Sequence, residues 1–149
     1  MPRVVLFLAT GAYAGYAPVA PGTVGSLLAI PMALFSYRVS LFSPSLSALL
    51  IALLIAGACW VAGEAEKLFA ERDSGRIVID EIVGFLAATF LLEPSIGRFL
   101  AVFLLFRLFD ILKPFPAGYL DRHLKGGIGV VLDDVVAGIY TNIFVRVFS

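Results

Sequence analysis

The amino-acid sequence predicts an all-α fold, a polytopic membrane helix bundle of about five or six helices. Hydrophobic residues make up 60% of the chain and charged residues 15%, whereas soluble domains have about 45–50% apolar and roughly 25% charged residues. The mean hydropathy is +0.99, and a small soluble domain could not hide that much apolar surface from water. The 149 residues are enough for a single domain over residues 1–149. The net charge of zero gives no indication of nucleic-acid binding.

Apolar runs separated by helix breakers predict six helices in order, over residues 3–15, 24–37, 45–71, 81–93, 97–113 and 133–147. The breakers between them are Pro18, Pro21, Pro44, Gly75, Pro94, Pro114, Pro116 and Gly126. The run 46–62 has about the length that a spanning helix needs. The later runs are shorter and span only if their charged ends enter the interface. A signal peptide at the start is a weaker alternative, because the uncharged stretch continues to Tyr37; whether residues 3–15 span or re-enter stays open.

Counting membrane crossings places almost all acidic residues on one side. If each of the last four helices crosses, loops 72–80 and 114–132 share a side with segment 21–26. Ten of the eleven acidic residues lie on that side and only Glu93 lies opposite. Seven of the eleven basic residues lie there too, so the positive-inside rule makes it the cytoplasmic side.

Paired carboxylates on this side indicate a metal site. Asp80-Glu81 precede an apolar run, and Asp133-Asp134 follow a glycine-rich segment. Adjacent carboxylates repel one another unless a cation neutralises them, and a hard divalent ion such as magnesium takes oxygen ligands. Asp80 stands where a helix N-cap is expected, which is the simpler interpretation, but capping needs only one acid.

Basic and hydroxyl residues nearby suggest an anion site. Three charged residues follow one another at a spacing of three, namely Arg107, Asp110 and Lys113. This spacing keeps them on one side of a helix. Ionisable residues within apolar surroundings indicate a site, although an interfacial ion pair with a snorkelling Lys113 is the alternative. The turn 20–26, with Thr23 and Ser26, opens a helix whose free N–H groups favour phosphate; glycine and proline also simply end helices. This combination fits chemistry on a phosphorylated lipid headgroup.

Missing signatures restrict the mechanism. The chain has no Asp-x-Asp pair, Cys59 has no arginine six positions later, and His123 is the only histidine. These absences argue against aspartyl-phosphate, cysteine-based and two-histidine phosphatases. Direct attack by a metal-activated water is the simplest remaining route, and whether a covalent intermediate forms stays open.

Three segments carry a resemblance to a known family: APVAPGTVGSLLAIP, DSGRIVIDEIVG and FRLFDILKPFPAGYLDRHLKGGIGVVLDDVVAG. Over roughly residues 15–140 the chain resembles the phosphatidylglycerophosphatase A family. The resemblance implies a magnesium-dependent, multi-pass enzyme of the bacterial inner membrane with its active site facing the cytoplasm. Such an enzyme hydrolyses phosphatidylglycerophosphate to phosphatidylglycerol and phosphate in phospholipid biosynthesis.

The resemblance also implies that the acids in the matching motifs form the active site. On that basis we expect magnesium ligands at Asp80, Glu81, Asp110, Asp133 and Asp134. Of these, Asp80, Glu81, Asp110 and Asp134 are expected to be catalytic, and Asp110 holds metal or positions water. Arg107 and Lys113 would bind phosphate, with Thr23 and Ser26 as weaker candidates. The number of metal ions, the oligomeric state and the range of substrates stay open.

Two other functions remain as alternatives. A small membrane ion transporter would use the carboxylates as an ion path, but it predicts acids spread through the depth of the membrane. A lipid-binding subunit without activity would keep the same cluster. A phosphotransferase that uses a CDP-alcohol is a weaker alternative, because its longer aspartate-rich motif is absent.

Overall fold

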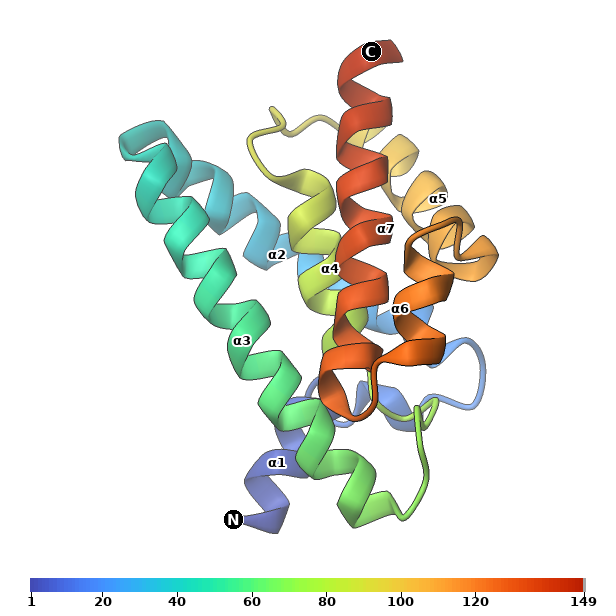
Figure 1. The fold of residues 1–149 in the computed structure, drawn as a ribbon. Helices are drawn as coiled ribbons and strands as arrows, with labels where there is room; N and C mark the ends of the chain where they lie inside the picture. Colours follow the sequence, from blue (N-terminus) through green and yellow to red (C-terminus); the bar gives the residue numbers. More distant parts are fainter. Residues whose placement is uncertain (149) are drawn as a thin grey trace.

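The computed structural model describes residues 1–148, which fold into seven α-helices and one short 3-10 turn (Figure 1). The helices are α1 Pro2–Ala9, α2 Pro21–Phe42, α3 Pro44–Phe69, α4 Ile79–Thr89, α5 Ile96–Leu112, α6 Ala117–His123 and α7 Gly127–Phe148, and the turn is Ala14–Tyr16. These described residues form no strand. The all-α prediction is confirmed.

Three of these helices are long and apolar enough to cross a membrane, namely α2, α3 and α7, with 22, 26 and 22 residues. Large apolar side chains such as Phe35, Leu53 and Trp60 are exposed on α2 and α3, which suits contact with lipid rather than water. The predicted membrane helix bundle is therefore confirmed. The 11-residue helix α4 is too short to span a bilayer by itself and is packed inside the bundle.

Several of the sequence-based boundaries were wrong. The first helix ends at Ala9, not at residue 15, and α6 lies within a segment predicted as loop, so the helix count exceeds five or six. Helix α7 begins at Gly127, six residues before the predicted start. The sequence places Gly127 in a loop, but in the structure it lies against α3, and a Cβ there would collide with the carbonyl oxygen of Cys59. Small residues permit such close approach of membrane helices.

Helix α2 also differs from its prediction of 24–37. It begins at Pro21, in the first turn, where the missing N–H of proline costs nothing. It continues through Pro31 to Phe42, although an interior proline removes a backbone hydrogen bond and favours a bend. The helix is therefore long enough to span, despite a breaker in its middle.

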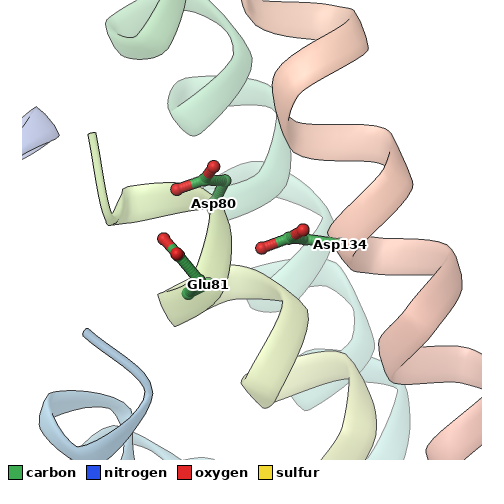
Figure 2. Close-up of side chains that lie close together, drawn as sticks. All are labelled: Asp80, Glu81 and Asp134. Atoms are coloured by element: carbon green, nitrogen blue, oxygen red, sulfur yellow. The ribbon is translucent and has the colours of Figure 1, made fainter. Parts of the chain in front are cut away.

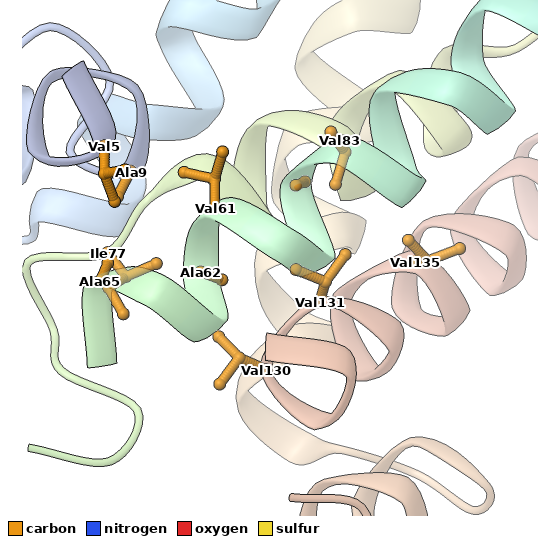
Figure 3. Close-up of a cluster of buried hydrophobic side chains, with 11 residues drawn as sticks. Val5, Ala9, Val61, Ala62, Ala65, Ile77, Val83, Val130, Val131 and Val135 are labelled. Atoms are coloured by element: carbon orange, nitrogen blue, oxygen red, sulfur yellow. The ribbon is translucent and has the colours of Figure 1, made fainter. Parts of the chain in front are cut away.

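Helices α4 and α7 cross at two glycines. A Cβ at Gly138 would collide with the carbonyl oxygen of Gly84, and a Cβ at Gly84 would lie 2.8 Å from the carbonyl oxygen of Asp134. Buried side chains from α3, α4 and α7 pack beside this crossing, among them Val61, Val83 and Val131 (Figure 3). The crossing therefore holds the first turn of α4 close to the early turns of α7.

Charged helix ends meet at one end of the bundle. The Nζ of Lys113, just after α5, lies 2.6 Å from Oδ2 of Asp133 in α7. Arg72, just after α3, donates to the carbonyl of Asp121 in α6 at 2.7 Å. These contacts agree with the crossing count made from the sequence, which placed loops 72–80 and 114–132 on the same side.

Candidate metal and phosphate site

Three carboxylates from two helices form a compact group. Asp80 and Glu81 lie in the first turn of α4, and Asp134 lies in α7. One oxygen of each can be chosen such that all three lie within 4.8 Å of one another. Figure 2 shows Asp134 pointing from its helix toward the two acids of α4. We call Asp80, Glu81 and Asp134 the three-acid cluster.

Capping does not explain the acids of α4. The N-cap of this helix is Val78, and no side chain makes a cap hydrogen bond there. The expectation that Asp80 stands at the N-cap was wrong, because the helix begins at Ile79 and Asp80 falls inside its first turn. Its carboxylate is therefore not used to satisfy the helix end.

The cluster is buried and incompletely paired. Asp80 and Asp134 are only 7% and 4% exposed. Within the described residues, Oδ1 of Asp80, Oε2 of Glu81 and Oδ2 of Asp134 have no hydrogen-bond partner. Burying unpaired carboxylates together is strongly unfavourable. A cation between them would supply the missing partner for each oxygen.

Arg107 of α5 connects Asp110 to the three-acid cluster. Its Nη1 lies 2.6 Å from Oδ2 of Asp110 and 3.7 Å from Oε1 of Glu81. Asp110 is therefore next to the cluster through the guanidinium and is not among the three acids that converge. The guanidinium adds positive charge and planar N–H donors, which suit a phosphate group.

The start of α2 lies against both Glu81 and Arg107. A Cβ at Gly22 would collide with Oε1 of Glu81 and would lie 3.1 Å from Nη1 of Arg107. Ser26, predicted as a phosphate ligand, is buried and donates its hydroxyl to the carbonyl of Gly22 at 3.0 Å. Thr23 is half-buried in the same turn. The glycine at this contact was missed as a site residue, although the Pro-Gly-Thr sequence pointed to the correct turn.

Lys113 lies between two carboxylates. Its Nζ is 2.6 Å from Oδ2 of Asp133 and 3.2 Å from Oδ2 of Asp121. Partial burial acts to lower the pKa of Lys113, but the hydrogen bonds and charges of Asp133 and Asp121 outweigh it and raise that pKa above its ordinary value. Asp133 lies outside the three-acid cluster, but its Oδ1 has no partner among the described residues. Asp121 was not predicted as a site residue, because a single acid in a predicted loop gives no signal in the sequence.

Two other ionisable residues make contacts outside the three-acid cluster. Glu64 pairs with Lys67 on the exposed end of α3. His123 is exposed and stacks on Tyr119 at 3.9 Å between ring centroids. The cluster therefore draws on the start of α4 and the early turns of α7, with α5 and α2 beside it.

Comparison with known proteins shows the family. The family model described as Phosphatidylglycerophosphatase A matches residues 7–149. A Bacteroides thetaiotaomicron protein named putative phosphatidylinositol-3-phosphatase is 37% identical over 148 residues, covering 95% of this chain and 91% of its own.

Two relatives are named phosphatidylglycerophosphatase A. The Escherichia coli protein is 35% identical, covering 89% of this chain and 76% of its own, and the Haemophilus influenzae protein is 38% identical, covering 93% and 84%. No solved structure matches. The resemblance seen in the three sequence segments is confirmed, and the chain belongs to the phosphatidylglycerophosphatase A family.

Proposed function

We propose that this chain hydrolyses the terminal phosphomonoester of phosphatidylglycerophosphate, releasing phosphatidylglycerol and phosphate for phospholipid biosynthesis. The family and two of its named members support this substrate. The structural observation that carries the proposal is the three-acid cluster, buried and incompletely paired, beside the guanidinium of Arg107. That arrangement would combine a cation site with a phosphate contact at one end of a membrane bundle.

The ligand set of the cluster suits magnesium. Asp80, Glu81 and Asp134 offer only carboxylate oxygens, which hard divalent cations prefer, whereas zinc sites usually include nitrogen or sulfur. Magnesium, when bound, would supply positive charge that neutralises the phosphoryl oxygens. We include Asp133 and Asp110 as further candidate ligands, Asp133 through its unpartnered Oδ1 and Asp110 through its position beside Arg107.

The remaining site residues would bind and orient the phosphate. Arg107 would exchange part of its contact with Asp110 for the phosphoryl oxygens, as a planar guanidinium can do. Lys113 would add charge from the neighbouring loop, and Thr23 would contribute its hydroxyl at the start of α2. Ser26 would stabilise that turn or bind phosphate after releasing the Gly22 carbonyl. Asp110 would position either Arg107 or the attacking water.

We place the chain in a bacterial inner membrane, with this site facing the cytoplasm. Seven of the eleven basic residues are assigned to the end of the bundle that holds the site and four to the other end. By the positive-inside rule, this excess supports that orientation. The bacterial source of the named relatives supports the membrane.

A second substrate has one specific observation in its favour, the name of the Bacteroides thetaiotaomicron relative, putative phosphatidylinositol-3-phosphatase. Phosphate release should therefore be measured from both lipids in mixed micelles, with magnesium and after chelation. We expect release from phosphatidylglycerophosphate that stops on chelation. Faster release from phosphatidylinositol 3-phosphate would reassign the substrate. Unchanged activity after chelation would refute the requirement for a metal ion.

A further inference from the structure

An apolar groove of about 440 Å³ lies between α2, α3 and α4. Its walls include Met32 of α2, Leu50 and Leu54 of α3, and Leu86 of α4. The groove has the size of a small-molecule site, but no acidic or basic residue lines it, and it does not include the three-acid cluster. Its occupant must therefore be recognised by shape and hydrocarbon contact.

The two polar residues in the wall use their hydroxyls on each other. Oγ of Ser36 and Oγ of Ser47 lie 3.0 Å apart, and Ser47 also donates to the carbonyl of Ser36 at 3.1 Å. Both hydroxyl hydrogens can thus be satisfied within the wall. A water molecule or a polar ligand gains little there, because the remaining lining is apolar.

The groove opens toward the outside of the bundle. Met32 and Leu50 are 38% and 37% exposed, although they line the groove from helices long and apolar enough to span a membrane. Met32 lies near the middle of α2 and Leu50 six residues after the start of α3, and exposed side chains at such positions of a spanning helix face hydrocarbon. The material that reaches the groove is therefore lipid acyl chain.

The same helices carry both the groove and the site. Leu86 follows Glu81 by five residues on α4, about 8 Å along the helix axis, and Pro31 follows Gly22 by nine residues on α2, about 14 Å. Figure 1 shows the α2–α3 hairpin leaning away from α4, so the helices separate beyond the site. Pro31 lines the groove. The groove thus begins about 8 Å along α4 from the three-acid cluster, roughly the length of a lipid headgroup, and continues toward the membrane.

We propose that this groove holds an acyl chain of the substrate lipid while its terminal phosphate lies at the three-acid cluster. The proposal rests on the proposed function and adds a second contact to it. Lipid tails are as apolar as leucine, so burial from the bilayer gives little driving force. The groove therefore acts through packing and shape, and it positions the lipid so that the phosphate reaches the carboxylates.

The first test fills the groove. In Leu50→Trp the larger side chain should lower kcat/KM for dipalmitoyl phosphatidylglycerophosphate by about ten-fold, mainly by raising KM. A loss of this size is typical of an apolar group that fits poorly in a pocket. The deacylated headgroup, which has the same phosphomonoester, should be hydrolysed at the wild-type rate. The matched control is Leu53→Trp on the same helix, because Leu53 is 60% exposed and does not line the groove. Equal loss on both substrates, or no loss, would refute the proposal.

The second test uses the unaltered protein and does not depend on the folding of a variant. A phosphatidylglycerophosphate analogue with a photoreactive diazirine on one acyl chain should label residues of α2 and α3 that line the groove. Unlabelled phosphatidylglycerophosphate should suppress that labelling, and phosphatidylcholine should not. Labelling elsewhere, equal labelling by a diazirine phosphatidylcholine, or cross-links to a second copy of the chain would overturn the proposal. Normal phosphate release with such a result would leave the proposed function intact, whereas no release would refute that function separately.

Discussion

Gly138 of α7 lies against the backbone carbonyl of Gly84 of α4, so closely that a Cβ at position 138 would collide with it. Asp134 precedes Gly138 by four residues, and Asp80 precedes Gly84 by four. Residues four apart lie on the same face of a helix. The contact between the glycines therefore places Asp134 beside Asp80 and Glu81, and the spacing of the three-acid cluster depends on the backbone approach.

Gly138→Ala should separate α4 from α7 and move Asp134 away from the acids of α4. We expect a loss of about 1–3 kcal/mol in stability, as for other overpacking changes, and a fall in phosphate release of about ten-fold or more. Thermal unfolding in detergent and phosphate release measure the two effects.

The control for this variant is Gly57→Ala in α3, where no atom lies within 4 Å of an added Cβ. Replacing an interior helical glycine by alanine should be neutral or should stabilise the protein by up to about 1 kcal/mol. If both variants behave alike, the glycine crossing does not set the geometry of the cluster.

Gly22→Ala should disturb the site with a smaller effect on the fold. The added Cβ would collide with the carboxylate of Glu81 and crowd Arg107, so Glu81 must move away from the start of α2. We expect phosphate release to fall by about ten-fold and the melting temperature to change little. Gly97→Ala, where an added Cβ meets no atom within 4 Å, should retain full activity, and equal activity in the two variants would contradict this role of Gly22.

Lys113→Gln should destabilise the junction of α5, α6 and α7. The substitution removes the ammonium that lies 2.6 Å from Asp133, a residue only 4% exposed. A buried carboxylate without its partner is costly, but Lys113 is itself partly exposed, so we expect a loss of about 2 kcal/mol. Denaturation in mixed micelles tests this value, and Lys125→Gln, at an exposed position, should have no effect. Equal stability of the two variants would show that the ion pairs are unimportant.

The charge pattern of the sequence was sufficient to predict the helical class and the end of the bundle where the charged residues meet. Charged residues flank the apolar runs, and a membrane forces them to its faces. Residues such as Asp80, Glu81 and Asp134 could be proposed because adjacent acids beside apolar runs are unusual. Their grouping apart from Asp110 and Asp133 could not be foreseen, because it depends on which faces of α4 and α7 touch.

The glycines show why the rest could not be predicted. Taken locally, Gly127 and Gly129 indicate a loop, because glycine weakens a helix. In the structure they lie in α7, where Gly127 permits the close approach of α3. Pro31, by contrast, lies inside both the predicted helix 24–37 and α2. At Gly127 a contact between helices overrides the local preference, and that contact is not visible in a single sequence.

The central claim is that the three-acid cluster binds the metal ion that hydrolysis of the lipid phosphate requires. Its most direct test is phosphate release from phosphatidylglycerophosphate over a range of magnesium concentrations by wild type, Asp134→Asn and the control Glu93→Gln, whose exposed acid follows the far end of α4. We predict that Asp134→Asn lowers the rate at saturating magnesium by about two orders of magnitude and raises the magnesium concentration needed for half-maximal activity, while Glu93→Gln changes neither. A wild-type rate and an unchanged magnesium requirement in Asp134→Asn would contradict the claim.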